Sequence, residues 1–430
     1  MQLRDLHWSL APTPLSPHVM ENIERILQAV RLRMEMDVAF VSEFLQHDRV
    51  FRGVSPDDGT GPLVAGDVLS LGKGYCRHVV EGRLPQLIPD TAAVEFTATI
   101  AETHALPIGA HLSVPIALEG GRIFGTLCCF SHRANLSLGE RDIALLRTLG
   151  DVIATEIAAD ICDDTRRRAA LKAIQAAVDA GDPYIVVQPI RRLTDRSLTG
   201  VECLARFAAE PGRSPDLWFA DAQSVAYGVE LELLAARKAL ALCADLPAPL
   251  SISINFSPDT LVAASMPEAL AGFDPQRIVI EMTEHVPVQD YGPIIETLKP
   301  LRSKGMRIAI DDAGAGYSSL RHILSIRPDV IKLDIGLTRD VDSDPVRNAL
   351  AAALAEFARR TETMLVAEGI ETEKEFETLR DLGFHTGQGY LLGRPQPLGQ
   401  LLSEIGPLTS LAGATPPKPR RQPARAKPLP

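Results

Sequence analysis

Between residues 182 and 405, short apolar runs alternate with longer segments that have helical periodicity. The apolar runs are rich in β-branched residues and predict eight strands, namely YIVVQPI, LTGVECLAR, LSISINFSP, RIVIEMTE, MRIAIDDAG, DVIKLDI, MLVAEGIE and the weaker FHTGQGY. Amphipathic helices are predicted between them, for example in LELLAARKALALCADL and PVRNALAAALAEFARR. Strands that alternate with helices over this length predict a TIM-type (β/α)8 barrel.

One connection departs from this regular alternation. Only RRLTDRS separates the first two predicted strands, which is too short for the helical crossover that parallel neighbours require. We therefore expect these two strands to be antiparallel, which gives a modified TIM (β/α)8 barrel with one antiparallel strand.

The pattern before the barrel predicts a smaller α+β domain at residues 20–160. This domain opens with an amphipathic helix, VMENIERILQAVRLRME, and continues with the strand DVAFVSEF. The segments GAHLSVPIAL and RIFGTLCCFSH flank Glu119, Gly120 and Gly121, and this pattern predicts a hairpin with a glycine turn.

A long apolar stripe follows this domain. From Glu140 the helical pattern continues to Gly181, and its apolar positions begin with Ile143, Leu146, Leu149, Ile153, Ile157 and Ile161. Two short helices at a domain boundary would produce this pattern. One continuous helix that pairs with its twin in a parallel homodimer would produce it as well. Both alternatives stay open at this point, and the second predicts a homodimer.

These patterns divide the chain into five segments. They are an N-terminal extension (1–19), the α+β domain (20–160), a connecting helix (161–181), the barrel (182–405) and a tail (406–430). The tail includes PPKPRRQPARAKPLP, which mixes proline with basic residues and has no acid, so we expect it to be disordered. Such a tail can contact anionic lipid or RNA, but a solubilising extension is the simpler interpretation.

Composition restricts the partners and the compartment. The net charge of −11 argues against sequence-independent binding of nucleic acid, which needs a basic surface. The opening MQLRDLHWSLAPTPLSP does not have the pattern of a signal peptide, and no apolar run approaches the ~20 residues of a membrane span. The six cysteines include no CxxC pair, which favours a reducing compartment. We therefore expect a cytoplasmic protein without stable membrane or nucleic-acid binding.

Polar residues collect at the ends of the predicted strands, where barrel enzymes have their active sites. They are Glu202, Asn255, Glu281, Asp311, Asp312, Lys332, Glu368 and, after the last strand, Gln388. A single acid in such a place is more simply a helix N-cap or a solvated loop residue, but here seven strands each supply a polar residue of a ligand type to the same end. Carboxylates crowded at one barrel mouth repel one another unless cations are present. Hard oxygen ligands select Mg2+ or Mn2+ over Zn2+.

The adjacent residues Asp311 and Asp312 favour two ions over one. One of these carboxylates can bridge both ions while the other reaches only the second. Two ions ~3.5–4 Å apart are the usual arrangement for in-line displacement at a phosphodiester. A lysine among the acids, here Lys332, can orient or deprotonate the attacking water.

An ordered set of motifs in residues 182–405 closely resembles that of the EAL-domain cyclic di-GMP phosphodiesterases. The motifs are ECLAR, SISINFSP, EMTE, DDAGAGYSSL, IKLD, AEGIE and QGYLLGRP. The resemblance implies hydrolysis of one phosphodiester of cyclic di-GMP to give linear pGpG, with two Mg2+ or Mn2+ ions required.

The resemblance also implies roles for individual residues. The implied metal ligands are Glu202, Asn255, Glu281 and Asp311, with Asp312 and Glu368 for the second ion. Lys332 corresponds to the lysine that activates water, Glu284 to the glutamate that anchors the loop after the Asp pair, and Glu371 to a supporting residue near the lysine. Gln188 and Arg206 resemble residues that contact the dinucleotide, and Gln388 lies near it and the metal-bound water.

Three departures from the family pattern stand out. The signature reads ECL in place of EAL, a change between small residues that should be harmless. The segment DDAGAG replaces the common DDFGTG, so Ala313 and Ala315 lack an aromatic ring and a hydroxyl. This leaves the turnover rate, and the coupling of activity to dimerisation, open. No GG(D/E)EF-like segment occurs, so no companion diguanylate cyclase is expected.

The N-terminal region resembles a GAF sensor domain, through GYCRHVVEGRLPQLIPD and GAHLSVPIALEGGRIFGTLCCFSH. The resemblance implies a sheet and helices that enclose a pocket for a small-molecule effector, which the sequence does not identify. Cys76 and His78 suggest a bilin or haem site, but we favour Cys76 in the core and His78 on a helix surface.

Three functions compete. The first is an active phosphodiesterase controlled by its GAF domain, and the second is a catalytically silent cyclic di-GMP receptor. The third is a scaffold for protein interactions. Every metal-ligand position of the resemblance is filled here, which favours the first.

Overall fold

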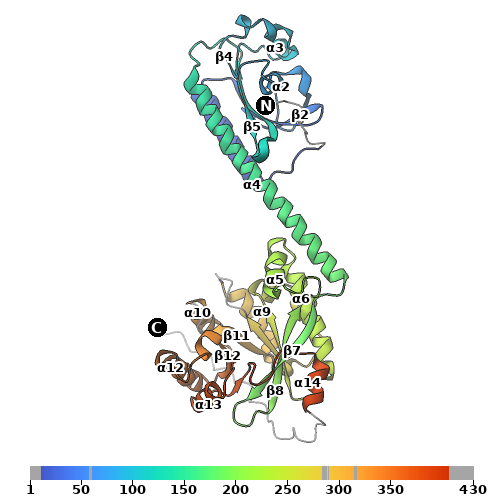
Figure 1. The fold of residues 1–430 in the computed structure, drawn as a ribbon, viewed down its shortest axis with the longest axis vertical. Helices are drawn as coiled ribbons and strands as arrows, with labels where there is room; N and C mark the ends of the chain where they lie inside the picture. Colours follow the sequence, from blue (N-terminus) through green and yellow to red (C-terminus); the bar gives the residue numbers. More distant parts are fainter. Residues whose placement is uncertain (1–10, 58–60, 283–287, 289, 314–316, 406–430) are drawn as a thin grey trace, which may run out of the picture. The chain divides into compact units, whose positions relative to one another are not determined.

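The computed structural model describes residues 11–57, 61–282, 288, 290–313 and 317–405. The chain divides into two compact units, residues 1–166 and 167–430 (Figure 1). Among the residues that the structure describes, no helix is both long and apolar enough to cross a membrane.

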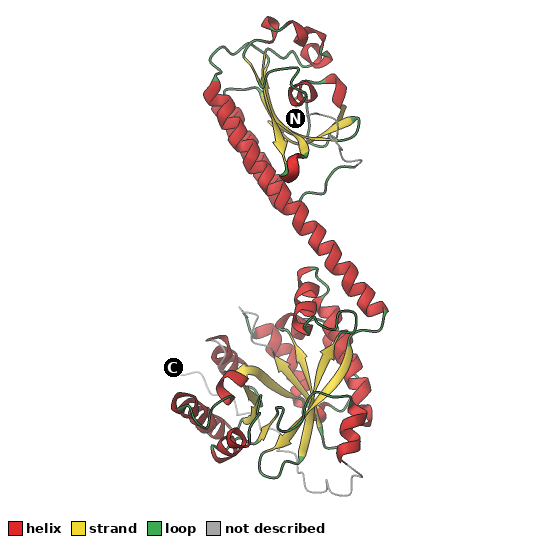
Figure 2. Cartoon of the chain, in the orientation of Figure 1, coloured by secondary structure: helices red, strands yellow, loops and turns green. Residues whose placement is uncertain are grey.

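The first unit is built on one antiparallel sheet with the strand order β3-β2-β1-β6-β5-β4 (Figure 2). Its strands are β1 (Val38–Phe44), β2 (Asp48–Ser55), β3 (Val68–Ser70), β4 (Leu87–Ile88), β5 (Ala110–Ala117) and β6 (Ile123–Ser131). Its helices are α1 (Pro17–Arg33), α2 (Tyr75–Val80), α3 (Ala101–Ala105) and the first part of α4 (Glu140–Asp179). The predicted hairpin is present as β5 and β6, with a turn at Glu119–Gly121.

Both faces of this sheet are covered, because successive strand residues point to opposite sides. On β1, Ala39 and Val41 join a core with α1 and α4, whereas Val38 and Phe40 join a second core with α2. The same alternation on β6 places Cys129 in the first core and Cys128 in the second.

Helix α4 is continuous over Glu140–Asp179, as the second alternative for the apolar stripe predicted. The assignment of the stripe to a dimer seam is wrong, however. Ile143, Leu146, Ile153 and Ile157 are at most 1% exposed and pack in the same core as α1. Side chains enclosed within their own domain cannot also bury a partner helix. The homodimer itself stays a prediction.

The second unit is a closed barrel with the strand order β10-β11-β12-β13-β14-β7-β8-β9. Its strands are β7 (Tyr184–Arg192), β8 (Leu198–Arg206), β9 (Ser251–Phe256), β10 (Ile278–Met282), β11 (Arg307–Ala313), β12 (Val330–Leu333), β13 (Met364–Ala367) and β14 (Thr386–Gly387). Strand β7 is antiparallel to both β8 and β14, and the other pairs are parallel. The modified (β/α)8 barrel predicted from the sequence is confirmed.

Helices surround this barrel (Figure 1). They are α5 (Pro215–Ser224), α6 (Gly228–Leu242), α7 (Pro258–Val262), α8 (Met266–Ala269), α9 (Gly292–Ser303), α10 (Tyr317–Ile326), α11 (Ile335–Thr338), α12 (Pro345–Thr361), α13 (Glu373–Asp381) and α14 (Leu398–Ile405). Strand residues that point outward, such as Ile280, Ile308 and Ile331, form one core with the larger helices.

Strand residues that point inward form layers inside the barrel. One layer is apolar and consists of Ile190, Val279, Ala309, Val330 and Val366. Side chains two positions further along a strand share its face. The next layer on the parallel strands therefore contains Glu281, Asp311, Lys332 and Glu368. An apolar floor thus lies directly beneath the polar residues.

Candidate metal centre at the barrel mouth

Lys332 lies at the centre of a carboxylate cluster at the carboxyl ends of the barrel strands. Its Nζ is 2.7 Å from Glu281 Oε2 and 2.9 Å from Asp311 Oδ1. It is 2.6 Å from Glu368 Oε1 and 3.5 Å from Glu202 Oε2. The predicted lysine and four of the predicted acids therefore lie together. They come from β8, β10, β11 and β12 and from the residue that follows β13.

The cluster has an excess of negative charge in a buried place. Burial alone would lower the pKa of Lys332, but the four surrounding carboxylates outweigh it and raise that pKa well above its usual value. Burial and the neighbouring carboxylates raise the pKa of Glu281 and of Glu368, despite the nearby lysine. One ammonium group does not compensate four carboxylates, so the cluster is suited to bind further positive charge.

The acids form two overlapping groups that fit hard cations. Carboxylate oxygens of Glu202, Glu281 and Asp311 lie within 4.8 Å of one another, and so do those of Asp311, Asp312 and Glu368. Asp311 belongs to both groups. This is the position that the predicted bridging ligand requires, although the role itself stays a prediction.

A local break in β11 places both aspartates in the second group. Consecutive residues of a regular strand point to opposite faces, but the pairing of β11 with β12 shifts register between Ile310 and Ala313. Asp312 adopts a left-handed backbone conformation, with φ of 52°. Such a conformation costs on the order of 1 kcal/mol in a non-glycine residue and is typical of functional sites.

Two amides complete the polar layer. Asn255 Nδ2 donates to Glu202 Oε1 at 3.0 Å, while its buried Oδ1 has no hydrogen-bond partner among the described residues. A buried amide oxygen beside carboxylates is a suitable ligand for Mg2+ or Mn2+. Gln388 Nε2 donates to Glu202 Oε2 at 2.7 Å and to Glu368 Oε1 at 3.0 Å, and thus connects both carboxylate groups.

The two remaining candidates for substrate contact lie on β7 and β8. Gln188 is directly opposite Glu202 in the strand pair, and its Nε2 donates to the Gly393 carbonyl at 3.2 Å. Arg206 ends β8, on the same face as Glu202 and roughly 13 Å further along the strand. Its Nη1 donates to the Ala205 carbonyl at 2.7 Å.

The structure does not bring Glu371 to Lys332. The Glu371 carboxylate is exposed and accepts a hydrogen bond from Arg339 Nη2 at 3.1 Å. Glu284 and Ala315 lie outside the described residues.

Glu375 supports the site as well, although the pattern of strand ends does not indicate it. This buried carboxylate accepts hydrogen bonds from the backbone N–H groups of Asp340, Glu371 and Thr372, so it fixes the loop after Glu368. Thr372 and Glu375 form a capping box, and the T-x-x-E pattern in the sequence would have identified Glu375 as a structural residue.

Cys76 is buried, as expected, whereas His78 is half-buried and packs edge-on against Phe96, 5.1 Å between ring centroids. The expectation that His78 lies on a helix surface is therefore only partly right.

Comparisons with known proteins match both units. The EAL domain family matches residues 171–395, and the GAF domain family matches residues 19–157. The cyclic di-GMP phosphodiesterase PdeF of Escherichia coli is 28% identical over 255 residues, which cover 57% of this chain and 34% of that protein. The cyclic di-GMP phosphodiesterase PA2567 of Pseudomonas aeruginosa is 32% identical over 228 residues, 49% of this chain and 38% of that protein.

A solved structure agrees in fold. The EAL domain protein from Listeria monocytogenes superposes with a TM-score of 0.50 and is 22% identical, covering 54% of this chain and 96% of that one. The matches to the two curated phosphodiesterases above cover 34% and 38% of those proteins. The likeness therefore concerns domains, not whole proteins.

Proposed function

Because this chain belongs to the EAL domain family and has a GAF domain before its EAL domain, we propose that it hydrolyses cyclic di-GMP to linear pGpG. The reaction requires two divalent cations, Mg2+ or Mn2+. The relatives that are named cyclic di-GMP phosphodiesterases support the substrate and the reaction class. Within this chain, the proposal is carried by five carboxylates in two overlapping groups, four of which meet around Lys332.

The ligand sets follow from these two groups. Glu202, Asn255, Glu281 and Asp311 would hold one cation, and Asp311, Asp312 and Glu368 would hold the other. Two divalent cations, when bound, supply the positive charge that a phosphodiester needs in order to be attacked. The carboxylates alone would repel the phosphate.

The other polar residues act on the water and the substrate. Lys332 Nζ lies in the acid layer, where it donates a hydrogen bond to Glu281 Oε2. From this position Lys332 orients the attacking water. Gln388 keeps Glu202 and Glu368 in place through its two hydrogen bonds. At the end of β8, the planar guanidinium of Arg206 suits the phosphate or a guanine edge, and Gln188 assists from β7.

We infer that the GAF domain binds a small-molecule effector and regulates the EAL domain, and that the protein acts as a homodimer. The regulatory role is supported by helix α4, which contributes Ile153 and Ile157 to the GAF core. The same helix contributes Ile174 and Ala177 to a cluster with Trp218 of the second unit. A continuous helix anchored in both cores can carry a conformational preference, provided that the effector favours one state.

The test is incubation of the purified full chain with cyclic di-GMP and Mn2+, with the products separated by chromatography. We expect a single product that elutes with pGpG, and none from a Glu202→Gln variant, which lacks a charged ligand. In a parallel sample with Ca2+ we expect binding without turnover, because calcium prefers looser coordination. Cyclic di-GMP that binds the Mn2+ protein but stays intact would instead establish the silent receptor.

A further inference from the structure

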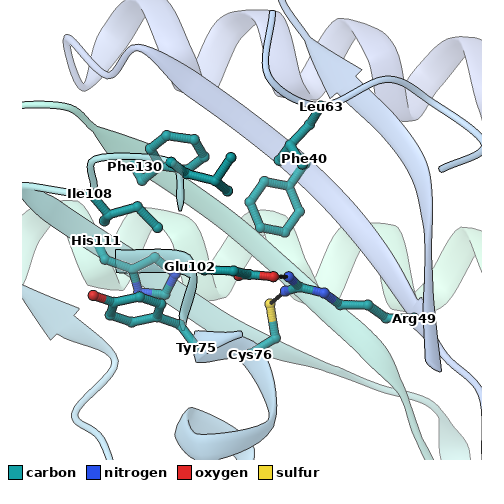
Figure 3. A pocket seen from close by; sticks show the side chains of 10 residues that line it. Phe40, Arg49, Leu63, Tyr75, Cys76, Glu102, Ile108, His111 and Phe130 are labelled. Atoms are coloured by element: carbon teal, nitrogen blue, oxygen red, sulfur yellow. Dashed lines mark hydrogen bonds and ion pairs between the residues drawn. The ribbon is translucent and has the colours of Figure 1, made fainter. Parts of the chain in front are cut away.

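A polar cluster lies within the apolar interior of the GAF domain, on the face of the sheet that α2 covers. It borders a small cavity that has room for about one water-sized molecule. Figure 3 shows Arg49 of β2 pointing at Cys76 of α2 and at Glu102 of α3, with Tyr75 and His111 beside them. Packing alone does not require a charged side chain and a thiol at such a deeply enclosed place.

Two thiols of this cluster are close enough to react with each other. Cys76 Sγ and Cys128 Sγ are 3.5 Å apart, and both residues are at most 1% exposed. A disulfide bond requires about 2.05 Å, so a movement of about 1.5 Å would join α2 to β6. The two residues are 52 positions apart, and the fold alone brings them together.

The surroundings make the two sulfurs unequal. Arg49 Nη1 donates to Cys76 Sγ at 2.8 Å, while its Nη2 pairs with Glu102. Burial raises the pKa of Cys76, but the hydrogen bond with Cys128 and the charge of Arg49 outweigh it and lower the pKa overall. Burial and the neighbouring thiol raise the pKa of Cys128 well above its usual value. Cys76 is therefore the nucleophile, since the thiolate is the reactive form.

A structural zinc site or inert packing would fit these contacts less well. A structural zinc site needs four ligands. Over the described part of the chain, the groups of three possible metal ligands are the two in the barrel, and neither contains a cysteine. Inert packing does not account for the buried arginine on Cys76. The pair Cys203 and Cys243 provides the comparison, because its sulfurs are 3.6 Å apart and neither residue lines the cavity beside Cys76.

We propose that Cys76 and Cys128 are a reversible redox pair, which a hydroperoxide that enters the cavity oxidises to a disulfide. The Cys76 thiolate attacks one peroxide oxygen, the O–O bond breaks, and a sulfenic acid forms. The second oxygen leaves with the electron pair and takes up a proton, giving water or an alcohol. The Cys128 thiol then attacks the sulfenic sulfur, the S–O bond breaks, and the hydroxyl leaves with the thiol proton as water.

The atoms and electrons of these two steps balance. Two thiols and one hydroperoxide give one disulfide, one water and one alcohol or second water. A thiol reductant returns the pair to its starting state by exchange. The cavity has room for about one water-sized molecule, so hydrogen peroxide, with two heavy atoms, is the hydroperoxide that we expect to reach Cys76. Formation of the disulfide removes the thiolate from Arg49 and ties α2 to the central part of the sheet.

The test uses the reduced full chain and stoichiometric hydrogen peroxide, followed by alkylation, digestion and mass spectrometry. We expect the alkylated cysteines to fall from six to four, and dithiothreitol to restore all six. The cross-linked peptides should contain Cys76 and Cys128. The pair Cys203 and Cys243 should stay alkylated. Its sulfurs are 3.6 Å apart, and the hydrogen bond with Cys203 and the charge of Arg277 lower the pKa of Cys243, but neither cysteine lines the cavity that admits the peroxide. Absence of the Cys76–Cys128 link, or earlier linkage of Cys203 to Cys243, would overturn the proposal.

Serine variants separate the roles of the two sulfurs. In Cys128→Ser, Cys76 should accumulate as a sulfenic acid that dimedone traps, whereas in Cys76→Ser no oxidation of Cys128 should occur. Serine suits both positions, because Arg49 can donate to it at 76, and Ser113 and Thr126 surround 128. The double change Arg49→Gln with Glu102→Gln should slow oxidation of Cys76 about tenfold, since it removes the charge that favours the thiolate. Dimedone labelling of Cys128 in place of Cys76 would contradict this assignment.

Discussion

Replacement of Lys332 by methionine separates the two tasks that we assign to this residue, which are charge compensation and catalysis. The side chain is 1% exposed, and its Nζ lies within 3.5 Å of four carboxylate oxygens. Loss of one partner of a buried ion pair usually costs about 3–5 kcal/mol, because the remaining charge is left uncompensated. In EDTA we therefore expect Lys332→Met to lower the free energy of unfolding of the barrel by about 3–5 kcal/mol.

Divalent cations should restore stability but not activity. A cation at about 100 times its dissociation constant stabilises the folded state by about 2.7 kcal/mol, so Mn2+ should stabilise Lys332→Met at least as much as the wild type. Hydrolysis should nevertheless be lost, while the affinity for cyclic di-GMP stays within about tenfold, since Lys332 is assigned to the water.

The assay is urea unfolding followed by the fluorescence of Trp218, which is buried in this unit, with and without Mn2+. Lys299→Met is the matched control, because Lys299 has an exposed partner, Glu296, at 3.6 Å. It should change stability by no more than about 0.5 kcal/mol. If Lys332→Met were as stable as the wild type in EDTA, the carboxylate cluster would not depend on Lys332 for its charge. If cyclic di-GMP binding fell together with activity, Lys332 would be a phosphate contact.

Three further predictions concern the bridging ligand, the GAF interior and helix α4. Asp311→Asn should reduce turnover by orders of magnitude, because Asp311 belongs to both carboxylate groups, and a variant with more than about a tenth of wild-type turnover would exclude the bridging role. Burial and the charge of Arg49 lower the pKa of His111 from 6.5 to about 3. Between these pH values the unfolded chain protonates His111 and the folded chain does not, so the free energy of unfolding decreases as the pH is lowered. When the pH is lowered from 6.5 to 5, the free energy of unfolding measured by calorimetry should decrease by roughly 2 kcal/mol more for the wild type than for His111→Phe. Equal decreases would contradict the assignment of His111 as a buried neutral side chain. Ile153→Asp should unfold the GAF domain, with a loss of more than about 3 kcal/mol, whereas Val152→Asp, at a position 43% exposed on the same helix, should be nearly neutral in circular dichroism melts.

The barrel and most of its polar layer could be predicted because both depend on local patterns. Strand periodicity identifies inward positions, and Glu281, Asp311, Lys332 and Glu368 each follow an inward apolar residue by two positions. What no pattern indicates is that one lysine reaches acids from four other strand ends. Nor does a pattern predict the left-handed conformation of Asp312, which depends on the register shift between β11 and β12.

The error over the stripe on α4 has a similar origin. Periodicity shows that a helix has an apolar face, but it does not show which surface covers that face. Here α1 supplies Ile23 and Leu27 to the same core as Ile153 and Ile157, so an intramolecular partner replaces the expected twin helix. The proximity of Cys76 to Cys128 was likewise hidden, since only the packing of α2 on β6 brings these distant residues together.

In the reaction that we propose, this chain directs water onto the phosphorus of one phosphodiester of cyclic di-GMP. The most direct measurement is a reaction with Mn2+ in water enriched in the heavy oxygen isotope, with substrate and product analysed by mass spectrometry. We expect pGpG that contains one heavy oxygen in its terminal phosphate, unlabelled remaining substrate, and no product from Lys332→Met. Unlabelled product, or cyclic di-GMP that remains intact when bound to the Mn2+ protein, would contradict the assignment of this site as a hydrolase.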